Sequence, residues 1–318
     1  MARYAADLAA VREAAKRIAG HAHRTQVATC ATLDGRAGRA LLLKCEQFQK
    51  GGAFKFRGAC NAVMKLSDAA AARGVATHSS GNHAQALALA ARLRGIAAHV
   101  VMPEDAPAVK RRAVVGYGAR VVACRPTLDD RESTLEQVIA ETGAVRIHPY
   151  DDADVIAGQG TVALELLEQA GPLDAIVAPV GGGGLVSGVA IAATESDPRL
   201  RVFGAEPLGA DDAARSKRAG RLIAQRDPRT IADGLLTSLG ERTWPVLRDR
   251  VEEVLTVSEE AIAAAMRLAW ERAKLLIEPS AAVALAAVLS EEFRARPGLA
   301  RVGVVLTGGN VDLERLPW

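Results

Sequence analysis

The sequence has few of the features that mark secreted or membrane-spanning proteins. Its 318 residues hold only four cysteines, and none of them forms a CxxC pair. A chain of this length buries a sizeable core without disulfides. No stretch approaches the ~18 uninterrupted apolar residues of a membrane span. These absences exclude a disulfide scaffold and a membrane partner, and they favour a reducing, cytoplasmic setting.

A strong excess of one charge is also missing. Forty Lys and Arg residues stand against 37 Asp and Glu residues, with both signs scattered and a formal net charge of +3. Without a basic stripe, nucleic acid is not expected as a partner. The N-terminal segment has Leu8, Val11, Ala15 and Ile18 on one helical face, interrupted by charges, which predicts a docked helix and not a signal sequence. The expected partner is a small molecule.

Short apolar runs alternate with Ala-rich helical patterns along the chain. This alternation predicts an α/β fold with a largely parallel sheet. No repeat or long linker separates two domains, so a second domain is expected to be inserted in the first. We expect a small domain at residues 74–149 within a large domain made of residues 1–73 and 150–318. The expected strands are 41–45, 75–79, 99–103, 120–124, 175–180, 202–206 and 302–307.

The first candidate site residue is Lys55, which stands between Phe54 and Phe56 just after Gly51 and Gly52. Most lysines on amphipathic segments keep their amine in water, and this segment alone favours such a surface lysine. The functional alternative is a desolvated amine that forms a Schiff base with a carbonyl.

Polar residues follow several strand candidates where a helix begins. The segment THSSGNHAQA, residues 77–86, surrounds a glycine with hydrogen-bonding groups that suit a carboxylate, although Ser and Asn are also common helix caps. Gly181 to Gly184 suit a phosphate, and no Lys-Ser/Thr follows as in a nucleotide P-loop. Thr307 ends the last strand candidate. Together with Lys55, these elements are what pyridoxal phosphate and an amino acid require.

At this point the sequence resembles the serine/threonine dehydratase and serine racemase family of fold type II pyridoxal-phosphate enzymes. The resemblance implies the tryptophan synthase β-like fold, with two open twisted α/β domains, the smaller inserted in the larger, and a homodimer. It runs nearly end to end and is carried by KCEQFQKGGAFKFRG, THSSGNHAQA, HPYDDADVIAGQGT, PVGGGG, AEPLGADD, TIADGLLTSLG, TWPVLRD, KLLIEPSAAV and VLTGGNVD.

The resemblance also implies roles for individual residues. Lys55 would carry the cofactor as a Schiff base, Phe54 would lie against its ring, and Asn82 would bond the ring hydroxyl. Thr307 would face the pyridine nitrogen. Further cofactor contacts would come from Gly181, Gly182, Gly183, Gly184 and Glu278. The substrate would be held by Ser79, Ser80, Asn82, His83, Arg131 and Thr237.

The implied main reaction is dehydration of a small hydroxy-amino acid. Lys55 would remove the α-proton as general base, the β-hydroxyl would leave as water, and an oxo-acid and ammonia would result. Ser80 matches the serine that faces the lysine across the cofactor in racemases, so serine racemase is an alternative. Dehydration of 3-hydroxyaspartate is another, because Arg131, Thr237 and Ser238 are expected near the substrate and could admit a second carboxylate. A β-replacement enzyme and a non-catalytic cofactor-binding module are weaker competitors.

AEPLGADD matches the family's site for a divalent cation, with Glu206, the carbonyl of Ala210 and Asp212 as ligands for Mg²⁺, Mn²⁺ or Ca²⁺. An acidic surface turn is the alternative. The sequence departs from the family at Ala53, where a Ser or Thr is usual, and at Gln26, where a Pro is usual. The chain ends a few residues after GGNVD, so no regulatory domain and no feedback control by isoleucine are expected.

Overall fold

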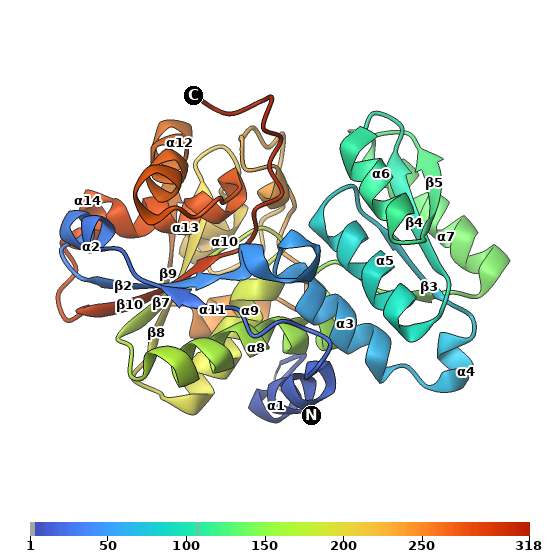
Figure 1. Ribbon diagram of the computed structural model, residues 1–318, viewed down its shortest axis with the longest axis horizontal. Coiled ribbons are helices and arrows are strands. Elements are labelled where there is room, and N and C mark those ends of the chain that lie inside the picture. The colour runs from blue at the N-terminus through green and yellow to red at the C-terminus, as the bar shows by residue number, and fades with distance from the viewer. Residues whose placement is uncertain (1–3, 107) are drawn as a thin grey trace.

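The computed structural model describes residues 4–106 and 108–318. Two sheets form the framework, and they lie on opposite sides of the molecule (Figure 1). The larger sheet has the order β1-β2-β10-β7-β8-β9; β1 is antiparallel to β2, and every other pair is parallel. Its strands are β1 (Val27–Ala28), β2 (Ala40–Cys45), β7 (Ala175–Pro179), β8 (Arg201–Pro207), β9 (Glu253–Val257) and β10 (Arg301–Leu306).

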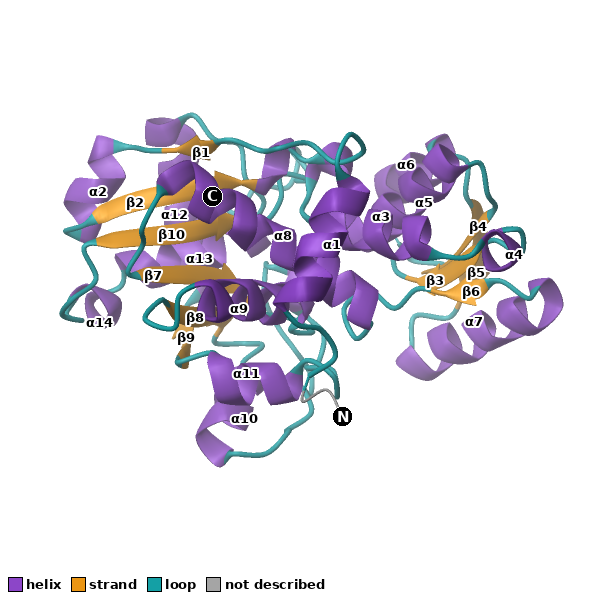
Figure 2. Ribbon diagram, turned by 90° about the horizontal axis from the view of Figure 1, so that it is seen from below, coloured by secondary structure: helices purple, strands orange, loops and turns teal. Residues whose placement is uncertain are grey.

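The smaller sheet is entirely parallel and has the order β5-β4-β3-β6. Its strands are β3 (Val75–His78), β4 (Ala98–Pro103), β5 (Arg120–Cys124) and β6 (Val145–Arg146). Helices α5 (Asn82–Arg94) and α6 (Ala108–Gly116) lie on one side of this sheet, and α7 (Leu128–Thr142) lies on the other (Figure 2).

Two apolar layers cover the faces of the larger sheet. Successive strand residues point to opposite faces, so Leu41 and Leu43 join one buried cluster and Leu42 joins the other. The first layer contains α2 (Ala31–Ala37), α12 (Glu259–Leu268), α13 (Pro279–Leu289) and α14 (Glu291–Arg294). The second contains α1 (Leu8–Ile18), α8 (Ala153–Ala170), α9 (Gly184–Ser196), α10 (Asp212–Ala219) and α11 (Trp244–Arg250).

Helix α3 (Lys55–Lys65) lies between the two sheets and is followed by the short α4 (Asp68–Ala71) (Figure 1). Phe56, Ala59 and Cys60 of α3 pack in one cluster with Leu87 of α5 and Val100 of β4. The first residue of α3 is therefore placed where the two halves of the molecule meet.

All seven expected strands are present, with ends that agree within one residue. The expected α/β architecture with largely parallel sheets is confirmed. The sequence missed β1, β6 and β9. The strands of the smaller sheet fall within residues 75–146, and the domain limits at 74 and 149 stay predictions. Of the helices that the structure describes, none has the length and apolar character needed to cross a membrane.

Candidate active site

Four helices begin near the carboxyl ends of parallel strands, which is where open α/β sheets bind ligands. Lys55 opens α3, Asn82 opens α5 after β3, and Gly184 opens α9 after β7. Glu278 caps α13, and Thr307 follows β10 directly. The contacts below show that most of these residues form one site.

Lys55 is held from both sides. Its Nζ donates to the carbonyl of Pro149 at 2.8 Å and lies 5.2 Å from the centre of the Phe54 ring. The backbone N–H of Phe54 donates to the carbonyl of Thr307 at 3.0 Å, which ties the start of α3 to the end of β10. Burial lowers the pKa of the Lys55 amine to about 8. This amine is therefore far more often neutral, and nucleophilic, than an exposed lysine.

The tetraglycine turn lies beside Lys55 because Tyr150 follows Pro149 in the chain. A Cβ on Gly182 would overlap the Tyr150 ring, and one on Gly184 would lie 2.9 Å from the Tyr150 Cα. Gly183 has a φ of +86°, which L side chains rarely adopt. The first amides of α9 have no partner within the helix, and Gly183 offers no side-chain cap. The turn therefore suits a phosphate bound through backbone N–H groups.

Asn82 connects the halves of the molecule. Its Nδ2 donates to Glu278 Oε1 at 2.9 Å, and its Oδ1 accepts from Asn310 Nδ2 at 2.9 Å. Glu278 Oε2 accepts from the Asn310 N–H at 3.1 Å. Burial, together with the negative charge of Asp233, raises the pKa of Glu278 to about 8. The sequence did not single out Asn310, although it closes the VVLTGGN segment.

The remaining predicted residues near α5 are Ser79, Ser80 and His83. Ser79 Oγ accepts from the Gly81 N–H at 3.3 Å, and Ser80 is half-buried in the same turn. His83 is buried, with Nε2 3.3 Å from the carbonyl of Ile147. Burial and the charge of Lys55 lower its pKa, so the ring is neutral. With Nε2 donating, Nδ1 accepts and does not donate to a carboxylate.

Arg131 and Thr237 lie in different surroundings. Thr237 is exposed and forms a hydrogen bond with Tyr150 that lowers the pKa of the phenol, although burial, the larger effect, raises this pKa to about 12. Thr237 therefore adjoins the glycine turn. Arg131 lies on α7 and donates through Nη2 to the carbonyl of Pro126 at 3.2 Å. Burial and the positive charge of Arg131 lower the pKa of His78. Among the described residues, neither Lys55 nor Asn82 is a hydrogen-bond partner of Arg131.

The predicted cation ligands lie at the end of β8. Glu206 is fully buried, and its oxygens accept from the N–H groups of Ala213 and Ala214 at 3.1 and 2.9 Å. Asp212 Oδ2 accepts from the Leu239 N–H at 2.9 Å. Burial raises the pKa of both carboxyls, with Asp212 at about 6, and the charge of Asp212 raises that of Glu206 further. Two buried carboxyls that need compensation fit a divalent cation.

The site combines a half-buried lysine with a lowered pKa, a turn suited to a phosphate and a strand-end hydroxyl, which are the protein groups that pyridoxal phosphate needs. The family model described as "Pyridoxal-phosphate dependent enzyme" matches residues 18–308. The chain belongs to this family. The resemblance inferred from the motifs is confirmed.

Individual relatives indicate which members of this family the chain is similar to. A serine racemase of Arabidopsis thaliana is 53% identical, over 99% of this chain and 96% of its own. A beta-hydroxyaspartate dehydratase of Paracoccus denitrificans is 50% identical, over 95% of this chain and 96% of its own. The structure of maize serine racemase superposes with a TM-score of 0.97 at 49% identity, covering 98% of this chain and 95% of the other.

Proposed function

We propose that this protein is a pyridoxal-phosphate enzyme that racemises serine and also eliminates water from it. The half-buried Lys55, whose amine has its pKa lowered to about 8 beside the tetraglycine turn, is the observation that carries the proposal. The motifs favoured dehydration as the main reaction. The similarity to serine racemases supports racemisation as the main activity and dehydration as the second.

The residues around Lys55 fit the cofactor. The backbone amides of Gly181 to Gly184 would hold its phosphate, Phe54 would lie against its ring, and Asn82 would bond its ring hydroxyl. Thr307 would face the ring nitrogen with a neutral hydroxyl, and Glu278 would hold Asn82 in place through the 2.9 Å hydrogen bond. The cofactor supplies an electron sink that acidifies the α-proton of a bound amino acid.

Lys55 acts as one of two proton carriers. In its neutral form Nζ takes the α-proton from one face, and the carbonyl of Pro149, 2.8 Å from Nζ, keeps the amine in position. Ser80 is the proposed carrier on the other face and delivers a proton to invert the centre. Alternatively, the β-hydroxyl takes up a proton and leaves as water after the first proton transfer, and a second water molecule hydrolyses the released enamine to the oxo-acid and ammonia.

A second candidate is dehydration of 3-hydroxyaspartate. This candidate is supported by the beta-hydroxyaspartate dehydratase of Paracoccus denitrificans, which is 50% identical to this chain. The additional carboxylate would require positive or hydrogen-bonding groups at the substrate side chain. Thr237 adjoins the glycine turn and could supply a hydroxyl to this carboxylate. Arg131 would have to leave the carbonyl of Pro126 before it could bind the carboxylate.

The decisive experiment is a substrate screen of the purified protein. L-Serine, D-serine, L-threonine and the stereoisomers of 3-hydroxyaspartate are incubated with the enzyme. Chiral chromatography measures inversion, and an oxo-acid assay measures elimination. We expect D-serine from L-serine together with pyruvate. Oxo-acid formation from 3-hydroxyaspartate without any inversion of serine would favour the second candidate, and absence of both products would refute both.

We also propose that Glu206, the carbonyl of Ala210 and Asp212 bind a divalent cation. Their carboxyls are buried and have raised pKa values, so a cation would stabilise the ionised forms. The cation would order the loop between β8 and α10 and would not touch the substrate.

A further inference from the structure

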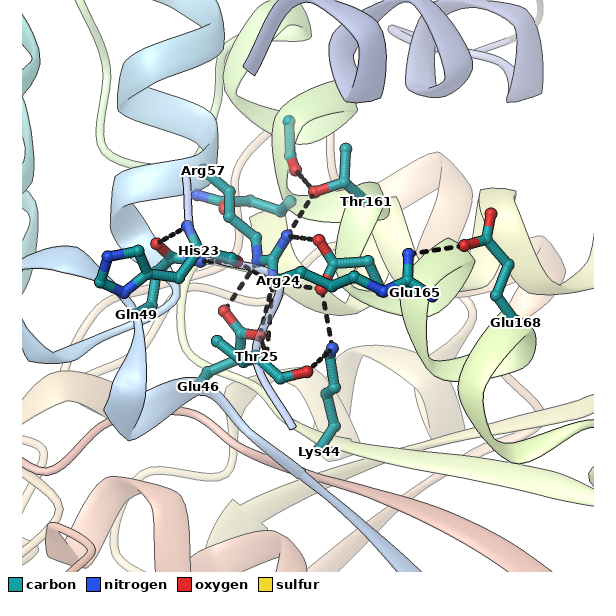
Figure 3. Close-up of polar contacts among 12 residues, drawn as sticks. His23, Arg24, Thr25, Lys44, Glu46, Gln49, Arg57, Thr161, Glu165 and Glu168 are labelled. Atoms are coloured by element: carbon teal, nitrogen blue, oxygen red, sulfur yellow. Dashed lines mark hydrogen bonds and ion pairs between the residues drawn. The ribbon is translucent and has the colours of Figure 1, made fainter. Parts of the chain in front are cut away.

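A cluster of four charged side chains includes Arg57 of the first turn of α3, with Lys44, Glu46 and Glu165 around it (Figure 3). Arg57, Lys44 and Glu46 have fully buried side chains, and the Glu165 side chain is 18% exposed. Two positive and two negative charges balance. Burying charges is unfavourable unless they are paired and hydrogen-bonded. A cluster in which every charge is paired and nearly every side chain is fully buried therefore calls for a physical explanation.

Arg57 is the centre of the cluster. Its Nε and Nη2 donate to the two oxygens of Glu46 at 2.7 and 2.8 Å. Its Nη1 and Nη2 donate to the two oxygens of Glu165 at 2.7 and 2.8 Å. Lys44 Nζ completes the charge balance by donating to Glu165 at 2.7 Å. A guanidinium bound by two carboxylates in this way is fixed in both position and orientation.

The position of Arg57 in the chain gives the cluster its significance. Arg57 lies in the first turn of α3, two residues after Lys55, and no side chain caps this turn. Before Lys55, the Phe54 N–H donates to the carbonyl of Thr307, which follows β10. After Lys55, Arg57 is bonded to Glu46, which follows β2, and to Glu165 of α8. Lys55 is therefore held between two anchors that belong to the framework of the larger sheet.

We propose that the Arg57–Glu46 pair is a positioning device for Lys55, which fixes the first turn of α3 so that Nζ stays at the Pro149 carbonyl. Arg57 touches neither cofactor nor substrate in this role. The inference rests on the proposed function of Lys55 as the cofactor-binding and proton-transferring residue. A rigid backbone at this point matters because a shift of about 1 Å in a reacting group can cost about 100-fold in rate.

The test compares variants that disturb different parts of the same cluster. R57M/E46Q removes one charge of each sign and leaves the pair of Lys44 with Glu165. R57K keeps the positive charge but loses the paired N–H donors that bind the two oxygens of each carboxylate. This variant replaces the double variant in the test if the double variant does not fold. K44M removes a fully buried charge without touching a contact of Arg57 with Glu46. K55M is the reference for a protein without the reacting amine.

Three quantities are measured for each folded variant: kcat and KM for serine, the thermal midpoint, and the rate at which cofactor-free protein takes up pyridoxal phosphate as a function of pH. We expect kcat to fall about 10- to 100-fold in R57M/E46Q, and less in R57K, with KM changed less than about 3-fold. The pH at which the rate of cofactor uptake is half-maximal, the pH midpoint, should rise in both R57M/E46Q and R57K. K44M should lose thermal stability and keep the wild-type pH midpoint and kcat.

A purely structural cluster would give a different result. K44M and the Arg57 variants would then differ only in thermal midpoint, with kcat and the pH midpoint unchanged in all of them, and the positioning role would be refuted. If K55M took up the cofactor with the wild-type rate and absorbance, the proposed function of Lys55 would fail instead. The two failures are thus distinguishable.

Discussion

At the scale of single residues, the proposed chemistry depends on the Lys55 amine, whose pKa is lowered by desolvation. Lys55 has no acidic side chain among the causes of its pKa shift, and desolvation alone lowers its pKa to about 8. A lysine paired with a carboxylate would remain charged and could not serve as a nucleophile at neutral pH. The fraction of neutral amine rises as the pH rises through about 8, so cofactor uptake should accelerate over the same range.

Replacement of Lys55 tests this residue directly. K55A should abolish the visible absorbance of the cofactor Schiff base and lower kcat by at least about 1000-fold, because both the covalent attachment and the general base are lost. Absorbance spectra and serine turnover measure the two effects. K65A, at the other end of α3 where the side chain is 52% exposed, is the control and should stay yellow and active. A yellow, active K55A protein would contradict the assignment.

Ser80 should separate the two reactions. S80A removes the proposed proton carrier on one face, so inversion of serine should fall at least about 10-fold while elimination starting from the Lys55 face persists. The ratio of D-serine to pyruvate formed from L-serine measures this. S133A, an exposed serine of α7, should leave the ratio unchanged. Equal losses of both products in S80A would show that Ser80 only orders its turn.

At the scale of structural elements, the strand-to-helix turns decide what can bind. The turn before α9 needs glycine because the Tyr150 ring lies against Gly182. G182A should therefore displace Tyr150 or the turn and weaken binding of pyridoxal phosphate at least about 10-fold, measured as Kd by absorbance titration. G35A is a matched control, because a Cβ there meets nothing within 4 Å and its φ is not positive. An unchanged Kd in G182A would argue against a phosphate at this turn.

The turn between β8 and α10 should respond to chelation. Removal of the cation should lower the thermal midpoint by about 5 °C, the effect of losing a ligand at about 100 times its Kd. The folded state raises the pKa of Asp212 to about 6, so its contribution to stability without a cation is present at low pH and is lost as the pH rises through about 6. Chelation should therefore destabilise the protein more at pH 8 than at pH 5.

Two neighbouring carboxyls give the matched variants for this prediction. D212A should reproduce the effect of the chelator and make the protein insensitive to it. D211A should not, because Asp211 pairs with Arg215 at 2.7 Å and is not a proposed ligand. A chelator that leaves the thermal midpoint of the wild-type protein unchanged at both pH values would remove the cation site.

At the scale of the whole molecule, the site exists because two sheets share one region. Asn82 of the smaller half contacts Glu278 and Asn310 of the larger half, and Lys110 of α6 forms an ion pair with Asp233. Helix α3 packs on α5 and on α8, so it belongs to both halves. A change in the relative placement of the halves would therefore alter the surroundings of Lys55 and Asn82 together.

The homodimer expected from the resemblance stays a prediction at this scale. Light scattering on the purified protein should give twice the 33.3 kDa of one chain. The same sample should retain its yellow colour, so that the mass refers to the cofactor-bound protein. A mass of one chain would contradict the expectation without touching the assignment of Lys55.

Much of the fold was predictable because local patterns determine it. Seven strands were read from short apolar runs, and Lys55, Gly181 to Gly184 and Thr307 were read from the turns that follow them. The two-residue strands β1 and β6 are too short to show a periodicity. Asn310 and Tyr150 were not singled out because their roles depend on neighbours that are distant in the chain: Asn82 lies 228 residues before Asn310, and Gly182 lies in a separate segment from Tyr150.

The sequence by itself determined seven of the strands, the family motifs and the lysine that we propose carries the chemistry, since each depends on residues close together in the chain. Only the tertiary structure decided how that lysine is held. The Pro149 carbonyl, the Thr307 carbonyl and the carboxylates of Glu46 and Glu165 reach the start of α3 from distant segments. Burial at this meeting point, which no local pattern encodes, is what lowers the pKa of the amine.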